Sequence, residues 1–233
     1  MEYHLFFDLD RTLWDFNQNS KCALKILFNN YVKSSYNISF DSFYKCYVRI
    51  NESFWDKYRK NQIEKSDLRV NRFRDTFLEF GIDDDILVNQ FSDGYVELSP
   101  YQTILFPNVI NVLKELKSLN YKMHIITNGF EEVQYIKLKN SGLIDFFQTV
   151  VCSEEINSLK PSPKIFNHAL KKANADLNNS VMIGDDYVAD IIGAEKSGFK
   201  VLHFVPDKGT QIIHQNNFKD FSELISKINK IFN

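Results

Sequence analysis

The chain has 233 residues, of which 44% are hydrophobic and 25% are charged, and its 28 lysines and arginines against 30 aspartates and glutamates give a formal net charge of −2. This composition excludes disordered, collagen-like and disulfide-rich chains. It also argues against binding to a nucleic acid polymer, which needs a strongly basic face. The length suits one sizeable α/β domain, or a core of about 150 residues with a smaller insertion.

The three cysteines lie far apart and form no CxxC pair, which favours neither a disulfide framework nor a thiolate metal site. The N-terminal apolar stretch stops at Asp8, and no later run approaches the roughly 18 apolar residues of a membrane span. We therefore expect a cytoplasmic protein that does not enter a membrane. A monomer and a dimer are both compatible with the sequence.

The chain opens with an apolar run at residues 3–7 that is typical of a buried strand. The long segment that follows, residues 16–101, lacks strand alternation, and its apolar residues recur three or four positions apart. This spacing predicts helices at 40–55, 66–80 and 85–98, with a further helical stretch before them. The sequence thus predicts an inserted, all-α helical cap domain.

After the insertion, short apolar runs alternate with amphipathic segments. Strands are expected at 121–126, 149–152, 181–183 and 200–205, and helices at 108–119, 131–140, 163–173 and 187–197. Strand and helix in alternation predict an α/β fold with a doubly wound, Rossmann-like parallel sheet. We assign residues 1–15 and 102–233 to this core and residues 16–101 to the cap.

Polar residues follow the predicted strands at the points where a doubly wound sheet gathers its ligands. They are Asp8 and Asp10 after the first strand, Thr127 and Asn128 after the second, Lys160 before a helix, and Asp185 with Asp190 after a later strand. Because alternate residues of a strand share a face, Asp8 and Asp10 can reach the same pocket.

Three carboxylates near one point repel each other unless a cation lies among them, and oxygen ligands without histidine or cysteine favour Mg²⁺. Thr127 and Asn128 offer donors at a helix N-terminus, which suits an anion. Lys160 adds a compact positive charge for phosphate oxygens. These residue types predict metal-assisted phosphoryl transfer.

The segment Asp8-Leu9-Asp10-Arg11-Thr12-Leu13, then Thr127, Lys160 and finally Gly184-Asp185 with Asp190, resembles the four motifs of the haloacid dehalogenase superfamily of hydrolases, in order. The resemblance covers the whole chain, including a helical cap just after the first motif. It differs at Arg11, where the family often has glycine, because arginine does not easily adopt a positive φ. Asp186 also stands where a small hydroxyl residue is frequent, and we expect it to cap the next helix.

The resemblance implies a role for each motif residue. Asp8 would be the nucleophile that forms an aspartyl-phosphate, and Asp10 would act as general acid and then general base. Mg²⁺ would be bound by the carboxylates of Asp8 and Asp185 and by the backbone carbonyl of Asp10. Thr127 and Asn128 would hold the transferring phosphoryl group, Lys160 would neutralise its charge, and Asp190 would orient Lys160 or a metal-bound water.

A closer resemblance is to the capped phosphatases that act as pyrimidine 5′-nucleotidases. It is carried by Ile126-Thr127-Asn128-Gly129-Phe130, by Leu159-Lys160-Pro161 and, in the cap, by Trp55, Tyr58 and Arg72. These cap side chains could stack on and hydrogen-bond a nucleobase, although aromatics at helical spacing are more often core residues.

The sequence therefore predicts a Mg²⁺-dependent phosphomonoesterase whose substrate is a small phosphorylated metabolite, in particular a pyrimidine nucleoside 5′-monophosphate. A sugar-phosphate phosphatase or phosphomutase of the same superfamily is the alternative. A 2-haloacid dehalogenase fits less well, because Asp10 would have no phosphate leaving group to serve. An inactive binding module also fits less well, because Asp8, Asp10, Lys160 and Asp185 are all intact.

Overall fold

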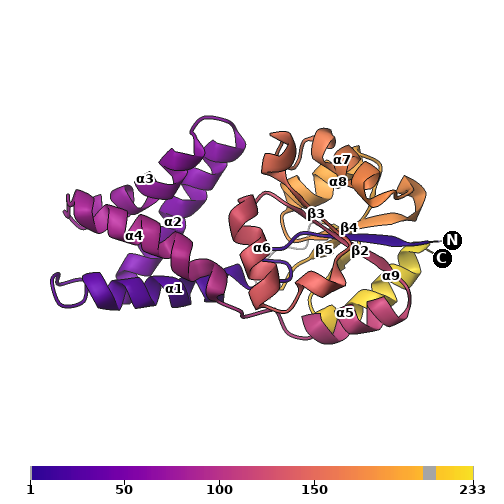
Figure 1. Ribbon diagram of the computed structural model, residues 1–233, viewed down its shortest axis with the longest axis horizontal. Helices are drawn as coiled ribbons and strands as arrows, with labels where there is room; N and C mark the ends of the chain where they lie inside the picture. Colours follow the sequence, from indigo (N-terminus) through magenta and orange to yellow (C-terminus); the bar gives the residue numbers. More distant parts are fainter. Residues whose placement is uncertain (1, 207–213, 233) are drawn as a thin grey trace. The chain divides into compact units, whose positions relative to one another are not determined.

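The computed structural model describes residues 2–206 and 214–232. It divides into two compact units, one comprising residues 1–16 and 103–233 and the other residues 17–102. The sequence places these boundaries after residues 15 and 101, and the units of the structure divide after 16 and 102. The first unit contains the sheet and the second is helical (Figure 1).

Within the described residues the first unit contains one parallel sheet. Its strands are β1 (His4–Phe7), β2 (Lys122–Thr127), β3 (Thr149–Cys152), β4 (Ser180–Gly184), β5 (Lys200–Phe204) and β6 (Asn217–Phe218). Their order across the sheet is β3-β2-β1-β4-β5-β6. This is the order of a doubly wound fold, in which the direction of winding reverses at β1. The predicted Rossmann-like core is thereby confirmed.

Helices cover both faces of the sheet and bury most of its strand residues. They are α5 (Val109–Ser118), α6 (Glu131–Asn140), α7 (Pro163–Ala173), α8 (Gly193–Lys196) and α9 (Leu224–Phe232). Leu5 and Phe7 of β1 pack in the core that includes residues of α5 and α9, whereas Phe6 packs with residues of α7 and α8 on the opposite face. Figure 1 shows these two layers on either side of the strands.

Two predictions for this unit need correction. The segment expected to be a helix at 187–197 begins as a π-helix, Tyr187–Ile192, and continues as the short helix α8. Strand β6 and helix α9 were not predicted. A strand of two residues is too short to show the alternation by which strands are detected in a sequence. Without a predicted strand before it, the last helix does not appear as part of a strand–helix alternation.

The second unit is built from α1 (Phe16–Tyr31), α2 (Phe40–Arg59), α3 (Lys65–Leu78) and α4 (Asp85–Leu98). Its core is rich in aromatic rings, among them Phe77 and Phe91, which meet edge to face with centroids 4.9 Å apart. Side chains cap α2, α3 and α4: the Ser39 hydroxyl accepts from the Ser42 amide, the Asp67 carboxylate accepts from the Glu64 amide, and the Asp84 carboxylate accepts from two amides of the first turn of α4. Helix α2 runs to Arg59 rather than ending at 55.

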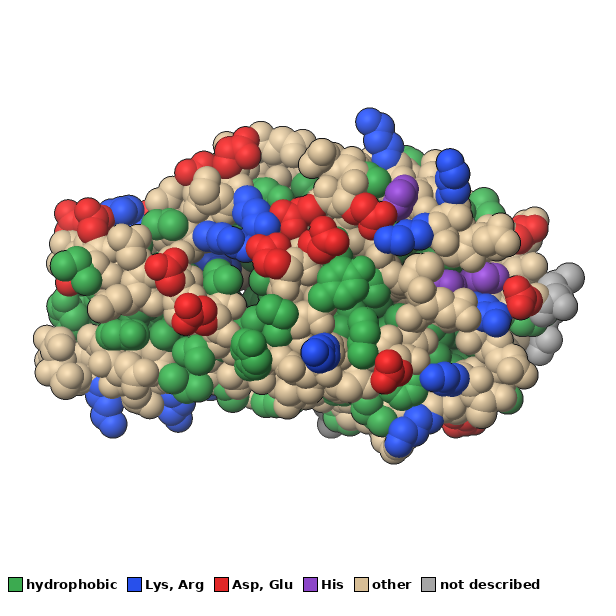
Figure 2. Space-filling model, viewed as in Figure 1, with side chains coloured by type: hydrophobic (Ala, Val, Ile, Leu, Met, Phe, Trp, Pro, Cys, Tyr) green, Lys and Arg blue, Asp and Glu red, His purple; other side chains and the backbone are tan. Residues whose placement is uncertain are grey.

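On the face shown in Figure 2, lysine and arginine side chains are scattered among acidic ones, as the near-neutral composition predicts. In the part of the chain that the structure describes, no helix has both the length and the apolar character needed to span a membrane.

Two histidines meet between β1 and β2. His4 Nδ1 lies 3.1 Å from His124 Nε2, and His124 Nδ1 lies 2.9 Å from the Thr149 hydroxyl. His124 is fully buried. Burial lowers the pKa of His124 to about 3, helped by the neighbouring His4 and Lys122. His124 therefore stays neutral in the folded protein over the pH range in which it would become protonated in the unfolded chain.

This difference predicts that the protein loses stability as the pH falls from 6.5 towards 3, because the unfolded His124 binds a proton that the folded one does not. Between pH 7 and pH 5 the loss from this residue is about 2 kcal/mol. In His124→Phe, which can retain the ring contact with Phe6, the difference in unfolding free energy between these two pH values should shrink by that amount. Urea unfolding of both proteins measures it, and an unchanged difference would contradict the account.

Candidate active site

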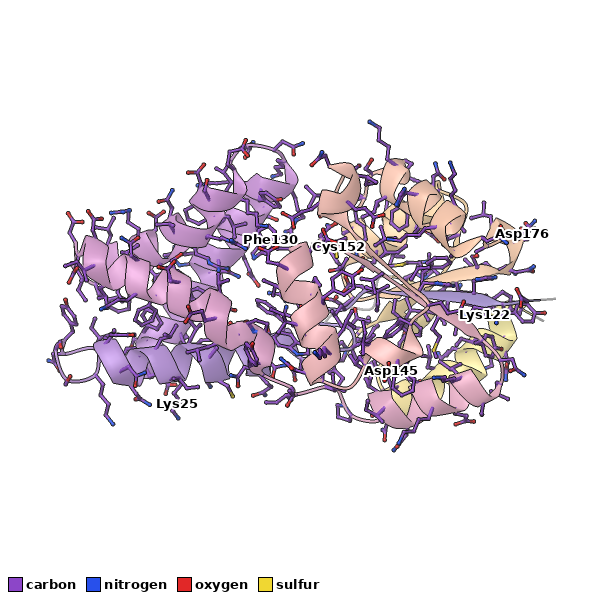
Figure 3. The ribbon with its side chains drawn as sticks, in the orientation of Figure 1. Lys25, Lys122, Phe130, Asp145, Cys152 and Asp176 are labelled. Carbon is purple, nitrogen blue, oxygen red and sulfur yellow. The ribbon has the colours of Figure 1, made fainter. Side chains whose placement is uncertain are left out.

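The site is built at the carboxyl ends of β1 and β4, where the sheet changes its direction of winding. Asp8 directly follows β1, and its amide donates to the Ile183 carbonyl of β4 at 2.9 Å. Asp185 directly follows β4. Figure 3 shows Phe130, just before α6, and Cys152, the last residue of β3, near this end of the sheet, with Lys122 at the opposite end. The fold thus brings the predicted motifs to the edge where doubly wound sheets bind ligands.

Lys160 lies at the centre of the site, and its side chain is only 2% exposed. Its Nζ lies 2.7 Å from Asp8 Oδ1, from Asp190 Oδ1 and from the Ile126 carbonyl oxygen. The Asp8 carboxylate and the Ile126 carbonyl accept hydrogen bonds from the ammonium, and Asp190 is its second buried counter-charge. Burial alone would lower the pKa of Lys160, but Asp190 and Asp8 outweigh it and raise the pKa. Lys160 is therefore a permanently charged partner of Asp8.

Asn128 fixes the main chain at Lys160. Its Nδ2 donates to the Lys160 carbonyl at 3.0 Å, and its Oδ1 accepts from the Lys160 amide at 2.8 Å. The Lys160–Pro161 peptide bond is cis. One Nδ2 hydrogen of Asn128 is engaged in this way, so its second Nδ2 hydrogen and its backbone N–H are the donors that it can present to a ligand.

Thr12, which is fully buried, connects the two strand-end carboxylates. Its hydroxyl oxygen lies 3.1 Å from Asp8 Oδ2 and 3.1 Å from Asp185 Oδ1. One hydroxyl proton can be donated to only one of these oxygens at a time. The oxygen that does not accept this proton lies close to the hydroxyl oxygen without a hydrogen bond, and a proton or cation on that carboxylate would reduce the repulsion.

The donor set fits a divalent cation. Carboxylate oxygens of Asp8, Asp185 and Asp190 lie within 4.8 Å of one another. With Lys160, the local formal charge is −3 + 1 = −2, which one divalent ion would balance. Donors that are all oxygen favour Mg²⁺. Burial raises the pKa of Asp8 to about 7, with Lys160 opposing and Asp190 adding to the rise, and burial and Asp8 raise the pKa of Asp185.

The Asp190 carboxylate reaches this cluster by packing directly against Gly184. A Cβ at residue 184 would lie 2.2 Å from Asp190 Oδ2, so only glycine leaves room for the carboxylate. The same oxygen accepts from the Asp186 amide at 3.1 Å. Asp186 itself caps the following helical segment by accepting from the amides of Val188 and Ala189, as expected from the sequence.

Asp10 lies outside the cluster of Asp8, Asp185 and Asp190 and has partners that the sequence analysis missed. Its Oδ1 accepts from Lys137 Nζ at 2.5 Å, and its Oδ2 accepts from Gln134 Nε2 at 3.1 Å. Both partners belong to α6 and are buried. The sequence offers one indication of these partners. Gln134 and Lys137 share a helix face with the apolar Leu138, so all three could have been expected to face the interior.

Thr127 ends β2 and is also tied to α6. Its hydroxyl donates to Gln134 Oε1 at 3.3 Å and accepts from the Gly129 amide at 3.0 Å. Gly129 provides the space for Gln134, because a Cβ there would lie 2.1 Å from Gln134 Nε2. The predicted phosphate-binding loop and Asp10 therefore share one scaffold.

Arg11 departs from the expectation for an arginine and has a φ of +69°. Its amide donates to the Trp14 carbonyl at 2.8 Å, and the Trp14 amide donates to the Leu9 carbonyl at 2.9 Å. The guanidinium carbon lies 5.2 Å from the centre of the Phe16 ring. These interactions offset the roughly 1–2 kcal/mol cost of left-handed backbone in a residue other than glycine.

The predicted base-binding residues lie in the helical unit. Trp55 and Tyr58 of α2 contact each other edge to face with centroids 5.8 Å apart. Arg72 of α3 is buried, donates from Nη1 to Asn51 Oδ1 at 3.0 Å, and its guanidinium carbon lies 4.9 Å from the Tyr95 ring centre. Their role in substrate binding stays a prediction.

The chain is similar to known proteins both in sequence and in fold. The sequence model of the haloacid dehalogenase-like hydrolases matches residues 5–204. The pyrimidine 5′-nucleotidase YjjG of Escherichia coli is 31% identical over 195 residues, 83% of this chain and 82% of that protein. A glyceraldehyde 3-phosphate phosphatase of Methanothermobacter thermautotrophicus is 29% identical over 198 residues, 85% of this chain and 83% of that protein.

Among solved structures, the magnesium-bound HAD-hydrolase YfnB of Bacillus subtilis superposes with a TM-score of 0.87 at 25% identity, covering 98% of this chain and 100% of that chain. The chain belongs to the haloacid dehalogenase-like hydrolase family, and within it is a phosphoric monoester hydrolase. This result confirms the family resemblance inferred from the four motifs.

The pKa of Asp8 predicts how Mg²⁺ binding depends on pH. At pH 6 the carboxyl is largely protonated and the cation must displace a proton, whereas at pH 8 it need not. We expect saturating Mg²⁺ to raise the melting temperature more at pH 8 than at pH 6. Asp185→Asn should abolish the shift, and Asp145→Asn, a change at an exposed carboxylate, should leave it intact. A Mg²⁺ shift that is equal at both pH values would contradict the assignment of Asp8 as a ligand.

Proposed function

We propose that this hydrolase is a Mg²⁺-dependent phosphatase that removes the 5′-phosphate of a pyrimidine nucleoside monophosphate through an aspartyl-phosphate on Asp8. The observation that carries the proposal is the contact between Asp8 and Lys160 at the end of β1, with a second carboxylate, Asp10, two residues further on. The cytoplasmic location and the choice between monomer and dimer stay predictions.

In the first displacement, a carboxylate oxygen of Asp8 attacks phosphorus and the ester bond between phosphorus and the 5′-oxygen breaks. As general acid, Asp10 carries a proton on the lone pair of Oδ2 that Gln134 leaves free and donates it to the departing oxygen, so the nucleoside leaves neutral. In the second displacement, water attacks the phosphorus of the aspartyl-phosphate, Asp10 takes up the water proton, and the Asp8 carboxylate departs. Asp10 then regains its initial protonated state and inorganic phosphate is released.

The remaining residues stabilise charge on the phosphoryl group. The backbone N–H of Asn128 donates to its oxygens at the entry to α6, where the helix N-terminus favours an anion. The hydroxyl of Thr127 also donates to them once its proton turns from Gln134 Oε1 to the bound phosphoryl group. Lys160 neutralises Asp8 and the transferring group, and Asp190 positions Lys160. The carboxylates of Asp8 and Asp185 and the Asp10 carbonyl would hold Mg²⁺, which would supply electrostatic stabilisation of the transition state.

Phosphate-ester chemistry accounts for this site better than halide release does. A dehalogenase needs no general acid at Asp10. It also needs no cluster of carboxylates whose net charge a divalent cation would balance. An idle binding module gives no reason for the chain to carry all the acidic and basic residues of the four motifs.

Two observations support a pyrimidine nucleotide as the substrate: the similarity to the pyrimidine 5′-nucleotidase YjjG, and the side chains that the helical unit offers for a base. In that unit Arg72 is 5% exposed, and its Nε has no hydrogen-bond partner among the described residues. A guanidinium of this kind, with Asn51 beside it, matches the carbonyl oxygens of a pyrimidine base. Trp55 and Tyr58 offer aromatic surface for stacking. The relative that is a glyceraldehyde 3-phosphate phosphatase keeps a sugar phosphate as the alternative substrate class.

Phosphate release with Mg²⁺ tests the proposal. Across pyrimidine monophosphates, purine monophosphates and small sugar phosphates, we expect kcat/KM to be highest for the pyrimidines. Asp8→Asn should lower it by at least about a thousandfold, because the nucleophile is lost. The exposed Asp145→Asn is the control. A preference for sugar phosphates would overturn the substrate assignment, and full activity of Asp8→Asn would overturn the mechanism.

Base recognition is tested separately by Arg72→Met. Losing a charged hydrogen bond to the base should raise KM for the best pyrimidine nucleotide by about ten- to a hundredfold and leave hydrolysis of p-nitrophenyl phosphate unchanged. Arg74→Met, on the same helix but paired with Asp85, should leave both substrates unaffected. Melting temperatures of both variants report folding, and an equal loss on both substrates in Arg72→Met would argue against base recognition.

A further inference from the structure

The carboxylate of Asp10 is held at both of its oxygens by a single helix. Lys137 Nζ donates to Oδ1 at 2.5 Å and Gln134 Nε2 donates to Oδ2 at 3.1 Å. The two donors are three positions apart on α6, so they project from the same face. Each carboxylate of the Asp8 and Asp10 pair thus has its own lysine, Lys160 for the first and Lys137 for the second.

Lys137 is placed for this contact and has little freedom to leave it. The residue is 3% exposed, and its Nζ lies 4.1 Å from the centre of the Trp14 ring and 5.8 Å from that of Phe16. Cation–π contact with two rings and one ion pair fix the ammonium in space. The Asp10 side chain is 24% exposed, so the held carboxylate still reaches solvent.

Gln134 connects Asp10 to the phosphate-binding loop. Its Nε2 donates to Asp10 while its Oε1 accepts from the Thr127 hydroxyl at 3.3 Å. The amide lies against Gly129, where any side chain would overlap it. Figure 1 shows α6 at the end of the sheet where β1 finishes, so one rigid element reaches both groups.

We infer that Lys137 and Gln134 are positioning residues for the reaction: they hold the Asp10 carboxyl where it meets the leaving oxygen of a phosphoryl group bound at Thr127. The inference rests on the proposed function, in which Asp10 is the general acid. It assigns to α6 a task beyond phosphate binding, namely to fix the distance between the phosphoryl group and its proton donor.

The leaving group separates positioning from a merely structural role. p-Nitrophenolate departs without a proton, whereas a nucleoside 5′-oxygen or another alkoxide needs one. The parameter kcat/KM reports the steps up to the first irreversible one, which here is transfer of the phosphoryl group to Asp8. Misplacing Asp10 should therefore depress kcat/KM for alkyl phosphates far more than for p-nitrophenyl phosphate. A loosened fold or weaker phosphate binding lowers both alike.

The experiment compares the wild-type protein with Lys137→Met and Gln134→Leu on p-nitrophenyl phosphate, phenyl phosphate and the best nucleotide, with Mg²⁺. We expect each variant to lose about ten- to a hundredfold in kcat/KM on the nucleotide and less than about threefold on p-nitrophenyl phosphate. Phenyl phosphate should fall between them. Lys139→Met, an exposed lysine of the same helix, should match wild type on all three.

Equal losses on all three substrates, or no loss on the nucleotide, would overturn the inference. If Lys137→Met does not fold, Gln134→Leu, which keeps the Lys137–Asp10 ion pair, decides the question. Failure of the proposed function has a different signature, since the wild-type protein would then hydrolyse none of the phosphates. If the wild type is active but the variants lose the same activity on all three substrates, the proposed function is retained and only the inference about Lys137 and Gln134 is rejected.

Discussion

The arrangement of this protein depends on one electrostatic constraint, which is the need to hold several buried carboxylates at one edge of a sheet. Asp8, Asp185 and Asp190 lie within 4.8 Å of one another. Left alone, like charges at that distance would raise one another's pKa and destabilise the folded chain. Lys160 supplies one opposing charge and a divalent cation would supply the other two. The rest of the site follows from keeping Lys160 in place.

The fold meets this constraint by making backbone and side chains converge on Lys160. Asn128 pairs with its main chain, the Ile126 carbonyl accepts one of its protons, and Asp190 reaches it across Gly184. These residues come from segments that follow different strands, which the parallel winding brings to one edge. A charge network assembled from several strand ends is preorganised, so little energy is needed to arrange it when the phosphoryl group arrives. The same logic extends to Asp10, which α6 holds through Lys137 and Gln134.

Much of this could be predicted from the sequence because strand ends carry a strong signal. Apolar runs followed at once by Asp8, Thr127 and Asp185 located the edge of the sheet. A buried parallel strand can be recognised from its own apolar residues, without knowing which strands lie beside it. The family resemblance supplied the roles. Tertiary contacts escaped prediction: Lys137 and Gln134 are residue types that are mostly exposed, and only the folded chain places them against Asp10.

The positive φ of Arg11 escaped for a related reason. Local sterics predict against it, and the contacts that offset the cost, to Trp14 and Phe16, exist only in the folded chain. Likewise, the sequence predicts that Asn128 holds a phosphoryl group but does not predict the contact of its side chain with the backbone of Lys160. The partners of Arg11 are close in sequence but contact it only in the folded turn, whereas Asn128 and Lys160 are 32 residues apart.

The central claim, that Asp8 forms a covalent phosphoryl intermediate, is tested most directly by the stereochemical course at phosphorus. The substrate is a pyrimidine nucleoside 5′-phosphorothioate made chiral with two oxygen isotopes and hydrolysed with Mg²⁺ in water carrying the third. Two successive in-line displacements, first by Asp8 and then by water, predict overall retention of configuration. Inversion would mean that water attacks the substrate directly, and it would contradict the account.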